Sequence, residues 1–99
     1  DLDNPLYDFE YLGPTAAIDH NGYPNGNDYF LANYRAGVRV LDLSQIGNNA
    51  LSEIGFFDTY PTDNIAKFNG VWNVYPFFES GVIAIHDIDN GLFLVKAAE

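Results

Sequence analysis

Residues 81–95 read GVIAIHDIDNGLFLV, and this stretch decides the fold class. Two short apolar runs, 82–86 and 92–95, flank a turn that ends in Asn90-Gly91. The runs are too short for typical helices, and Asp, Asn and Gly between such runs are ordinary hairpin-turn residues. Neither run alternates cleanly between apolar and polar residues. That pattern is typical of strands whose sheet is covered on both faces.

Short turn-forming segments recur along the whole chain. Turn signals rich in Asn, Gly and Pro separate short runs of Val, Ile, Leu, Phe and Tyr, which predicts an all-β protein. We expect segment 44–51 to be a loop because it contains Gly47 and two Asn residues. The predicted strands are 6–12, 16–19, 28–33, 38–43, 52–58, 71–75, 82–87 and 92–96.

The chain contains an internal repeat. Residues 29–41 align with residues 83–95, and Gly37 corresponds to Gly91, which gives a period of 91 − 37 = 54 residues. Upstream, residues 20–23 resemble residues 68–71 at an offset of 48, so the two copies differ by an insertion or deletion of six residues. Residues 51–58 echo residues 6–13. The strand order is therefore an outer strand followed by three inner strands, twice.

A period near 50 residues with four strands per unit is typical of β-propeller blades. We expect residues 1–99 to be a single β-propeller segment of about two four-stranded antiparallel blades. Outer strand 5–13 and inner strands 14–43 would form blade one, outer strand 51–58 would follow, and 68–96 would form blade two. A β-sandwich is the rival fold, but its strands alternate more cleanly. Two blades cannot close a ring, so they belong either to a longer chain or to an assembly of copies.

The composition limits the partners. Fourteen Asp and Glu residues against four Lys and Arg residues give a formal charge of −10. Such a chain lacks the basic groups that bind nucleic acid or anionic membranes. Without Cys it has no disulfide, no Cys-ligated zinc and no thiol nucleophile. No apolar run approaches about 18 residues, so we expect no membrane insertion. The other blades of the ring, or identical copies, are the expected partners.

Four motifs resemble the choice-of-anchor B family: TAAIDHNGY, YFLANYRAGVRVLDLS, EIGFFDTYP and FNGVWNVYPFFESGVIAIHDIDNGLFLVK. That family consists of secreted β-propellers built from LVIVD repeats. The resemblance implies the C-terminal blades of such a propeller, located outside the cell or on the outer surface of a Gram-negative bacterium. It implies no catalytic motif. His86 departs from the family pattern, in which a small residue such as Ser is usual.

The candidate ligand-binding residues are Asp19, His20, Tyr34, Arg35 and Tyr75. His20 starts an expected inner strand, so it would line a central channel, where His can bind or act as a base. Because neighbours in a strand point to opposite faces, Asp19 and His20 do not form a dyad by adjacency. Tyr34 and Tyr75 belong to a possible aromatic platform for sugars or peptides, or to blade packing. Arg35 suits either a bridge to a neighbouring blade's acid or a carboxylate clamp.

Asp87 and Asp89 are the candidate metal ligands, because clustered oxygens attract calcium. The spacing does not match a calcium loop, since Gly91 falls one position early and no Glu follows at the required distance. Asp and Asn immediately before Gly are also ordinary turn residues. We therefore expect the acids to build the turn and no cofactor to be required, with calcium as the alternative.

Three functions fit these observations. The first is a non-catalytic extracellular module that binds or scaffolds protein or polysaccharide. The second is a structural subunit that assembles into a ring or polymer. The third is a hydrolase whose site at Asp19 and His20 is completed by further blades. The absence of a Gly-x-Ser-x-Gly elbow disfavours serine hydrolysis.

Overall fold

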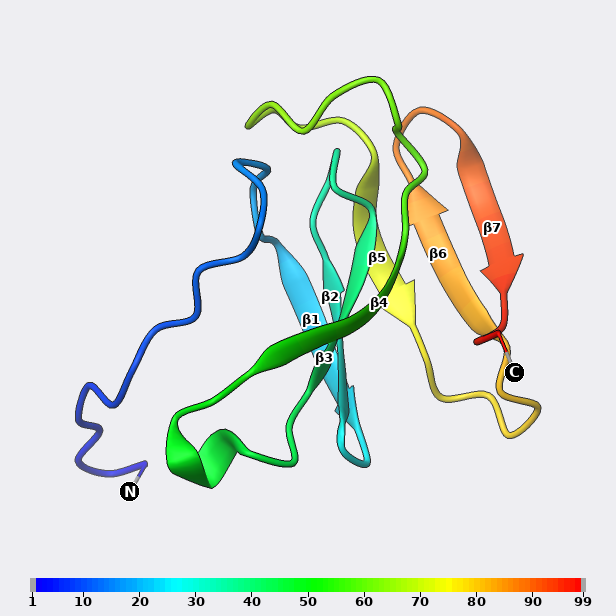
Figure 1. The fold of residues 1–99 in the computed structure, drawn as a ribbon. Helices are drawn as coiled ribbons and strands as arrows, with labels where there is room; N and C mark the ends of the chain where they lie inside the picture. Colours follow the sequence, from blue (N-terminus) through cyan, green and yellow to red (C-terminus); the bar gives the residue numbers. More distant parts are fainter. Residues whose placement is uncertain (1, 99) are drawn as a thin grey trace.

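The computed structural model describes residues 2–98 and is all-β, with two antiparallel sheets and no α-helix in that range (Figure 1). One 3-10 turn, Ile46–Asn48, lies inside the segment predicted as a loop. No helix within the described range is long and apolar enough to span a membrane. The strands are β1 (Asn21–Asn25), β2 (Asp28–Ala32), β3 (Val38–Asp42), β4 (Ser52–Phe57), β5 (Val71–Tyr75), β6 (Ile83–Asp87) and β7 (Gly91–Val95).

The first sheet has the order β1-β2-β3-β4, so each strand pairs with the next one along the chain. A two-residue loop joins β1 to β2, with Asn25 opposite Asp28 and Gly26 at φ 62°. Glycine adopts this left-handed conformation at no steric cost, which permits the tight hairpin. A bulge between Val40 and Leu41 interrupts the pairing of β3 with β4.

The second sheet has the order β5-β6-β7. Asp87 pairs with Gly91 across a three-residue loop, and Gly91 has φ 82°. The stretch that decided the fold class is therefore the β6–β7 hairpin. The expectation of two four-stranded units was wrong for this sheet, which has three strands in the described residues. None of those residues pairs with the outer edge of β7.

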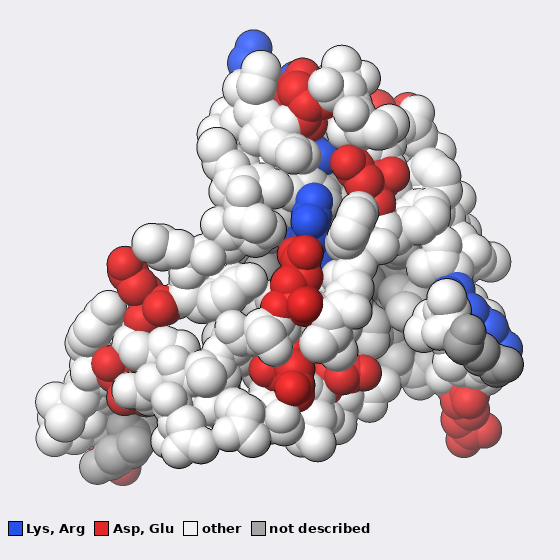
Figure 2. Space-filling model, in the orientation of Figure 1, with Lys and Arg blue, Asp and Glu red and all other residues white. Residues whose placement is uncertain are grey.

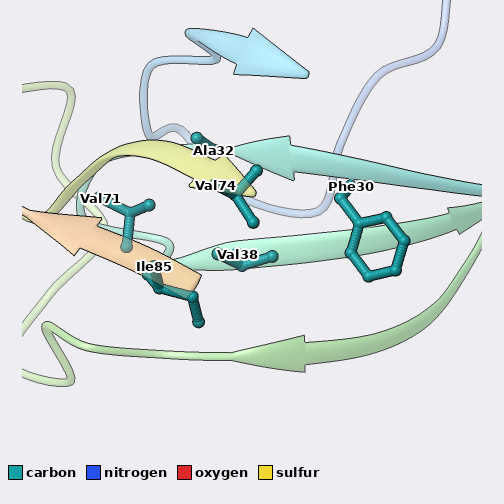
Figure 3. Packing of buried hydrophobic residues seen from close by; sticks show 6 residues of the cluster. All are labelled: Phe30, Ala32, Val38, Val71, Val74 and Ile85. Atoms are coloured by element: carbon teal, nitrogen blue, oxygen red, sulfur yellow. The ribbon is translucent and has the colours of Figure 1, made fainter. Parts of the chain in front are cut away.

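The two sheets stack face to face, and their contact forms the core (Figures 1 and 3). Each strand turns alternate side chains to this layer, so burial requires a partner sheet rather than a helix. Val71 and Ile85 are fully buried there. The core cluster consists of Phe30, Ala32 and Val38 from the first sheet and Val71, Val74 and Ile85 from the second.

Two strand predictions near the N-terminus were wrong. Residues 6–12 form no strand, and the first strand is 21–25 rather than 16–19. Asn21-Gly22 and Pro24-Asn25 read as turn residues, yet they pair along β2, with Gly22 opposite Leu31. Pro24 is tolerated because β1 is an edge strand, where a missing N–H costs little.

Candidate functional site

The structure brings two of the predicted ligand-binding residues, His20 and Tyr34, together. Their ring centroids lie 4.9 Å apart. His20 immediately precedes β1, and its backbone N–H donates to the carbonyl of Ala32 at 3.0 Å. Its Nδ1 lies 2.7 Å from the carbonyl oxygen of Trp72 in β5. Since a carbonyl only accepts, Nδ1 carries the hydrogen and Nε2 of the neutral ring keeps a free lone pair.

Further rings extend this group. Phe68 contacts Tyr34 edge to face at 5.4 Å, and the Trp72 ring lies 5.6 Å from the His86 ring. Tyr34 is buried, whereas the other four side chains are exposed. We call His20, Tyr34, Phe68, Trp72 and His86 the histidine–aromatic cluster. It combines ring faces with imidazole nitrogens, a set that can stack on and hydrogen-bond to a sugar or peptide.

Asp19 lies on a different surface. It lines a hollow of about 520 Å³ on the face of the first sheet that points away from the second sheet, together with Tyr11, Leu31 and Leu41. The pKa of the Tyr11 hydroxyl is raised above its ordinary value, first by burial and then by the carboxylates of Glu53 and Asp19. The neighbours Asp19 and His20 are therefore not brought together as a catalytic pair.

Val71 begins β5 next to the histidine–aromatic cluster. Tyr75 lies at the other end of this strand. Its ring contacts Phe77 at 5.4 Å and Phe78 at 4.9 Å, and Tyr23 contacts Phe77 at 6.0 Å. The predicted aromatic platform is therefore two separate groups at opposite ends of the stacked sheets.

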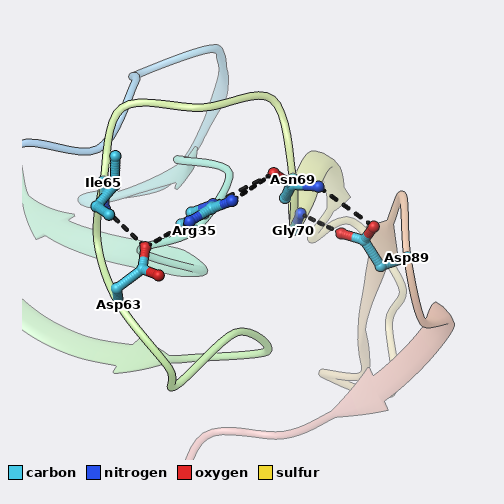
Figure 4. Close-up of polar contacts among 6 residues, drawn as sticks. All are labelled: Arg35, Asp63, Ile65, Asn69, Gly70 and Asp89. Carbon is cyan, nitrogen blue, oxygen red and sulfur yellow. Dashed lines mark hydrogen bonds and ion pairs between the residues drawn. The ribbon is translucent and has the colours of Figure 1, made fainter.

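Arg35 is the centre of a polar network (Figure 4). Its Nη1 donates to Asp63 Oδ1 at 2.6 Å, and its Nε and Nη2 donate to Asn69 Oδ1 at 3.3 and 2.7 Å. The guanidinium also lies over the Tyr60 ring, 4.7 Å from its centroid. Asn69 Nδ2 in turn donates to Asp89 at 3.4 Å. The hydrogen bond to Asp63 raises the pKa of Arg35 and lowers that of Asp63.

This network joins three parts of the chain: the β2–β3 turn, the connection 58–70 between the sheets and the β6–β7 turn. The sequence offered Arg35 either a bridge to a neighbouring blade's acid or a carboxylate clamp, and the acid that it contacts, Asp63, belongs to the connection between the two sheets. A carboxylate ligand at Arg35 would have to compete with Asp63 for Nη1, so a ligand-binding role remains a prediction.

The carboxylates of Asp87 and Asp89 are engaged within the fold. Oδ1 of Asp87 accepts the backbone N–H groups of Asp89 and Asn90, both at 2.8 Å, and its Oδ2 accepts the hydroxyl of Thr59. Oδ2 of Asp89 accepts the N–H of Gly70 at 3.0 Å. The contacts of Asp87 Oδ1 lie within the β6–β7 turn, as the sequence predicts, whereas Asp89 contacts the connection that precedes β5. No group of three or more His, Asp or Glu side chains suited to a metal ion occurs within residues 2–98.

Acidic groups are spread over the face seen in Figure 2, and basic groups appear at only a few places. Arg39 is held by its own chain: Nε donates to the carbonyl of Ala36 at 2.9 Å, and Nη1 lies 3.3 Å from Glu53. Its guanidinium lies 4.5 Å from the centroid of the Phe56 ring. Positive charge on this molecule is therefore committed to internal contacts wherever Arg occurs.

Sequence reasoning missed three residues that organise the site: Thr59, Asp63 and Asn69. All three lie in the connection 58–70, which has no strand partner and so shows no periodic pattern. Asn69-Gly70 carries a local signal, but that dipeptide by itself indicates only a turn.

Comparisons of the chain with protein-family models, with curated proteins and with solved structures found no match. The geometry described above therefore carries the functional argument.

Proposed function

We propose that this chain forms blades of a β-propeller that acts as a non-catalytic binding or scaffolding module outside the cell. One observation carries the proposal. Residues of β3 and their counterparts 54 positions later in β7 lie on the same face of their sheets, but only the face of the first sheet is covered by another sheet. The resemblance to secreted LVIVD-repeat propellers of the choice-of-anchor B family supports the same reading.

The uneven coverage is large. Val38 faces the second sheet and is 3% exposed. Leu92, 54 residues later, lies at the same place in the second sheet but is 59% exposed. Val40 packs against the core, whereas its counterpart Leu94 is 63% exposed. Burying one such side chain fully is worth about 1.5–3 kcal/mol, so this open face favours a further sheet.

The opposite end of the stack shows the complementary feature. Ile85 points from the second sheet toward the first and is fully buried. Its counterpart Leu31 points away from the stack and lines the hollow that also contains Leu41 and Leu43. Both end faces thus present apolar side chains that could pack against a further sheet, as blades do around a propeller axis. An ordinary two-layer sandwich would instead turn polar residues outward.

The histidine–aromatic cluster is the surface that we propose for ligand binding. Exposed Phe68 offers a ring face beside the imidazole of His20. His86 lies opposite Leu92 on the open face of the second sheet, so His86 and Trp72 can contact a ligand only where no further sheet covers that face. The buried ring of Tyr34 packs against the exposed ring of His20. Sugars and peptides of the cell envelope are the ligand classes that such a surface fits.

Ligand binding is tested with a glycan array and with pulldown from bacterial envelope extracts. Phe68→Ala, just before β5, is expected to abolish the signal, because it removes an exposed ring of the cluster that lies outside the strands of the open face. Tyr75→Ala, at the other end of β5, is the matched control and should retain binding. Empty arrays and pulldowns, or loss only with Tyr75→Ala, would contradict the proposed surface.

The open end faces also favour the second candidate, a subunit that assembles with copies of itself. Sedimentation of the 99-residue chain should show concentration-dependent association. Leu92→Lys with Leu94→Lys should abolish it by placing charge on the open face. Ile65→Lys with Ile88→Lys changes exposed apolar residues elsewhere and should not. A parent chain that stays monomeric at all concentrations would count against stacking. So would equal effects of the Leu92/Leu94 and Ile65/Ile88 lysine pairs on association.

A further inference from the structure

We infer that residues 6–12 form the outer strand of a sheet belonging to a second copy of this chain, by pairing with the free edge of its β7. The inference rests on the proposed stacking of sheets and adds to it a specific strand exchange.

The first observation is an unequal strand count. In the first sheet the outer edge of β3 is paired with β4. β7 occupies the corresponding place in the repeat, 54 residues after β3, yet its outer edge has no partner within residues 2–98. An unpaired edge presents a row of backbone donors and acceptors that favours addition of a strand.

The second observation is a segment with the sequence of a strand and no partner. Residues 6–13 echo 51–58, the stretch that contains β4, at an offset of 45. Residues 6–12 nevertheless pair with nothing in the described chain. Leu6, Tyr7 and Leu12 are 83, 81 and 80% exposed. Aromatic residues alternate along it at positions 7, 9 and 11, as they do in strands with one covered face.

The third observation is the position of this segment. Where the two sheets stack, Phe57 at the end of β4 contacts Phe93 of β7 at 5.7 Å. Phe57 minus the offset of 45 gives Leu12, and Phe93 minus the offset of 54 gives Arg39. If residues 6–12 formed a preceding outer strand, Leu12 would therefore lie near Arg39. Tyr11, adjacent to Leu12, indeed lies over the first sheet's outward face, where Arg39 and Glu53 act on its hydroxyl. Residues 6–12 therefore lie where the outer strand of a preceding sheet would lie.

That preceding sheet cannot be the chain's own second sheet. Figure 1 shows the N-terminal segment on one side of the molecule and β7 on the other, with the stacked sheets between them. The occupant that the repeat supplies is the β7 edge of a second copy, stacked with its open face on the hollow of the first sheet, because the free edge of β7 is equivalent to the edge of β3 that pairs with β4. This contact is head to tail, and it repeats the contact already present between the two sheets.

The register follows from the pairing of β3 with β4. Val38 lies opposite Phe57, and Val40 lies opposite Gly55. Shifted by 54 and 45 residues, these pairs become Leu92 with Leu12 and Leu94 with Glu10.

Crosslinking tests the pairing, since the chain has no native Cys. A chain carrying Leu12→Cys is mixed with one carrying Leu92→Cys and treated with a short bismaleimide. The expected product is a heterodimer of twice 11.0 kDa. Both replaced side chains are exposed, so the fold should tolerate the changes. Leu12→Cys mixed with Ile54→Cys, an exposed position on the free edge strand β4, is the control and should give only background.

Adding Glu10→Pro and Tyr11→Pro together to the Leu12→Cys chain should abolish the product, because consecutive N–H groups of a strand point to opposite sides and one of the two lost donors must therefore face β7. Glu10→Ala with Tyr11→Ala should preserve it. Equal yields with Leu92→Cys and Ile54→Cys, or insensitivity to the double proline change, would overturn the inference. If Leu92→Lys with Leu94→Lys disrupts association while no specific crosslink forms, stacking survives and strand exchange fails.

Discussion

Tyr34 and Val71 join the two sheets through their backbones. The N–H of Tyr34 donates to the carbonyl of Val71 at 2.7 Å, and the N–H of Val71 donates back to the carbonyl of Tyr34 at 2.9 Å. Tyr34 adopts φ 44°, an unusual conformation for a residue with a side chain. This bridge places the start of β5 directly against the β2–β3 turn and thereby positions the histidine–aromatic cluster.

Gly70 makes this close approach feasible. A Cβ at Gly70 would lie 2.3 Å from the carbonyl oxygen of Tyr34, and its φ is +86°. Gly70→Ala should lower the free energy of unfolding by about 2–5 kcal/mol, from backbone strain and steric overlap together. Urea unfolding measures the change. Gly81→Ala is the matched control, because Gly81 has φ +80° and no atom within 4 Å of the added Cβ. It should cost about 1–2 kcal/mol, and equal losses would contradict the role of the Tyr34 contact.

The core contact between the sheets depends on Ile85. This side chain is fully buried among residues of both sheets. Ile85→Ala should destabilise the fold by about 2–5 kcal/mol, through lost burial and the cavity that remains. Ile88→Ala, at a 52% exposed position in the adjoining turn, should change stability by no more than about 0.5 kcal/mol. Thermal unfolding of both variants checks the difference, and similar midpoints would show that the sheets do not pack as described.

The hydroxyl of Thr59 donates to the buried carboxylate of Asp87. Thr59→Val keeps the shape of the side chain but leaves one carboxylate oxygen without this donor. We expect a loss of about 1–3 kcal/mol, the typical cost of an unsatisfied buried group. Thr62→Val, at an exposed position of the same connection, should be nearly neutral. Chemical denaturation of the two variants is the measurement; a neutral Thr59→Val would show that Asp87 does not need this partner.

The Arg35–Asp63 contact predicts a pH dependence. Hydrogen bonds from Arg35, and next from the N–H of Ile65, hold the pKa of Asp63 below its ordinary value of 3.8. A carboxyl group whose pKa is lower in the folded state stabilises the fold at pH values above the unfolded-state pKa. It loses that contribution as the pH falls through the folded-state pKa.

Asp63→Asn should therefore be less stable than the parent chain at neutral pH, and the difference should shrink below about pH 4. Urea midpoints measured at a series of pH values test this. Glu79→Gln removes an exposed carboxylate and serves as the control, with little difference at neutral pH. A difference between Asp63→Asn and the parent that persists unchanged into strong acid would show that the ion pair is not its source.

The sequence by itself determined the strands that carry their own signals. Strands β2 to β7 lie within or beside the predicted ranges because apolar runs and turn glycines are local features. Gly37 and Gly91, aligned by the repeat, both adopt positive φ. The role of Asp87 in its turn was likewise a local matter, since its Oδ1 accepts the backbone N–H groups of Asp89 and Asn90.

Tertiary structure alone decided the remainder. Residues 21–25 became a strand because β2 offered an edge, although Gly22 and Pro24 disfavour strands locally. Residues 6–12, which resemble the stretch that contains β4, form no strand within the described chain. Arg35 contacts Asp63 and Asn69, which lie 28 and 34 residues further along the chain, so these contacts depend on how the chain folds back on itself. A segment forms a strand, and an arginine forms a salt bridge, only where a partner is present. A partner that is distant in the sequence cannot be identified from a short stretch of residues.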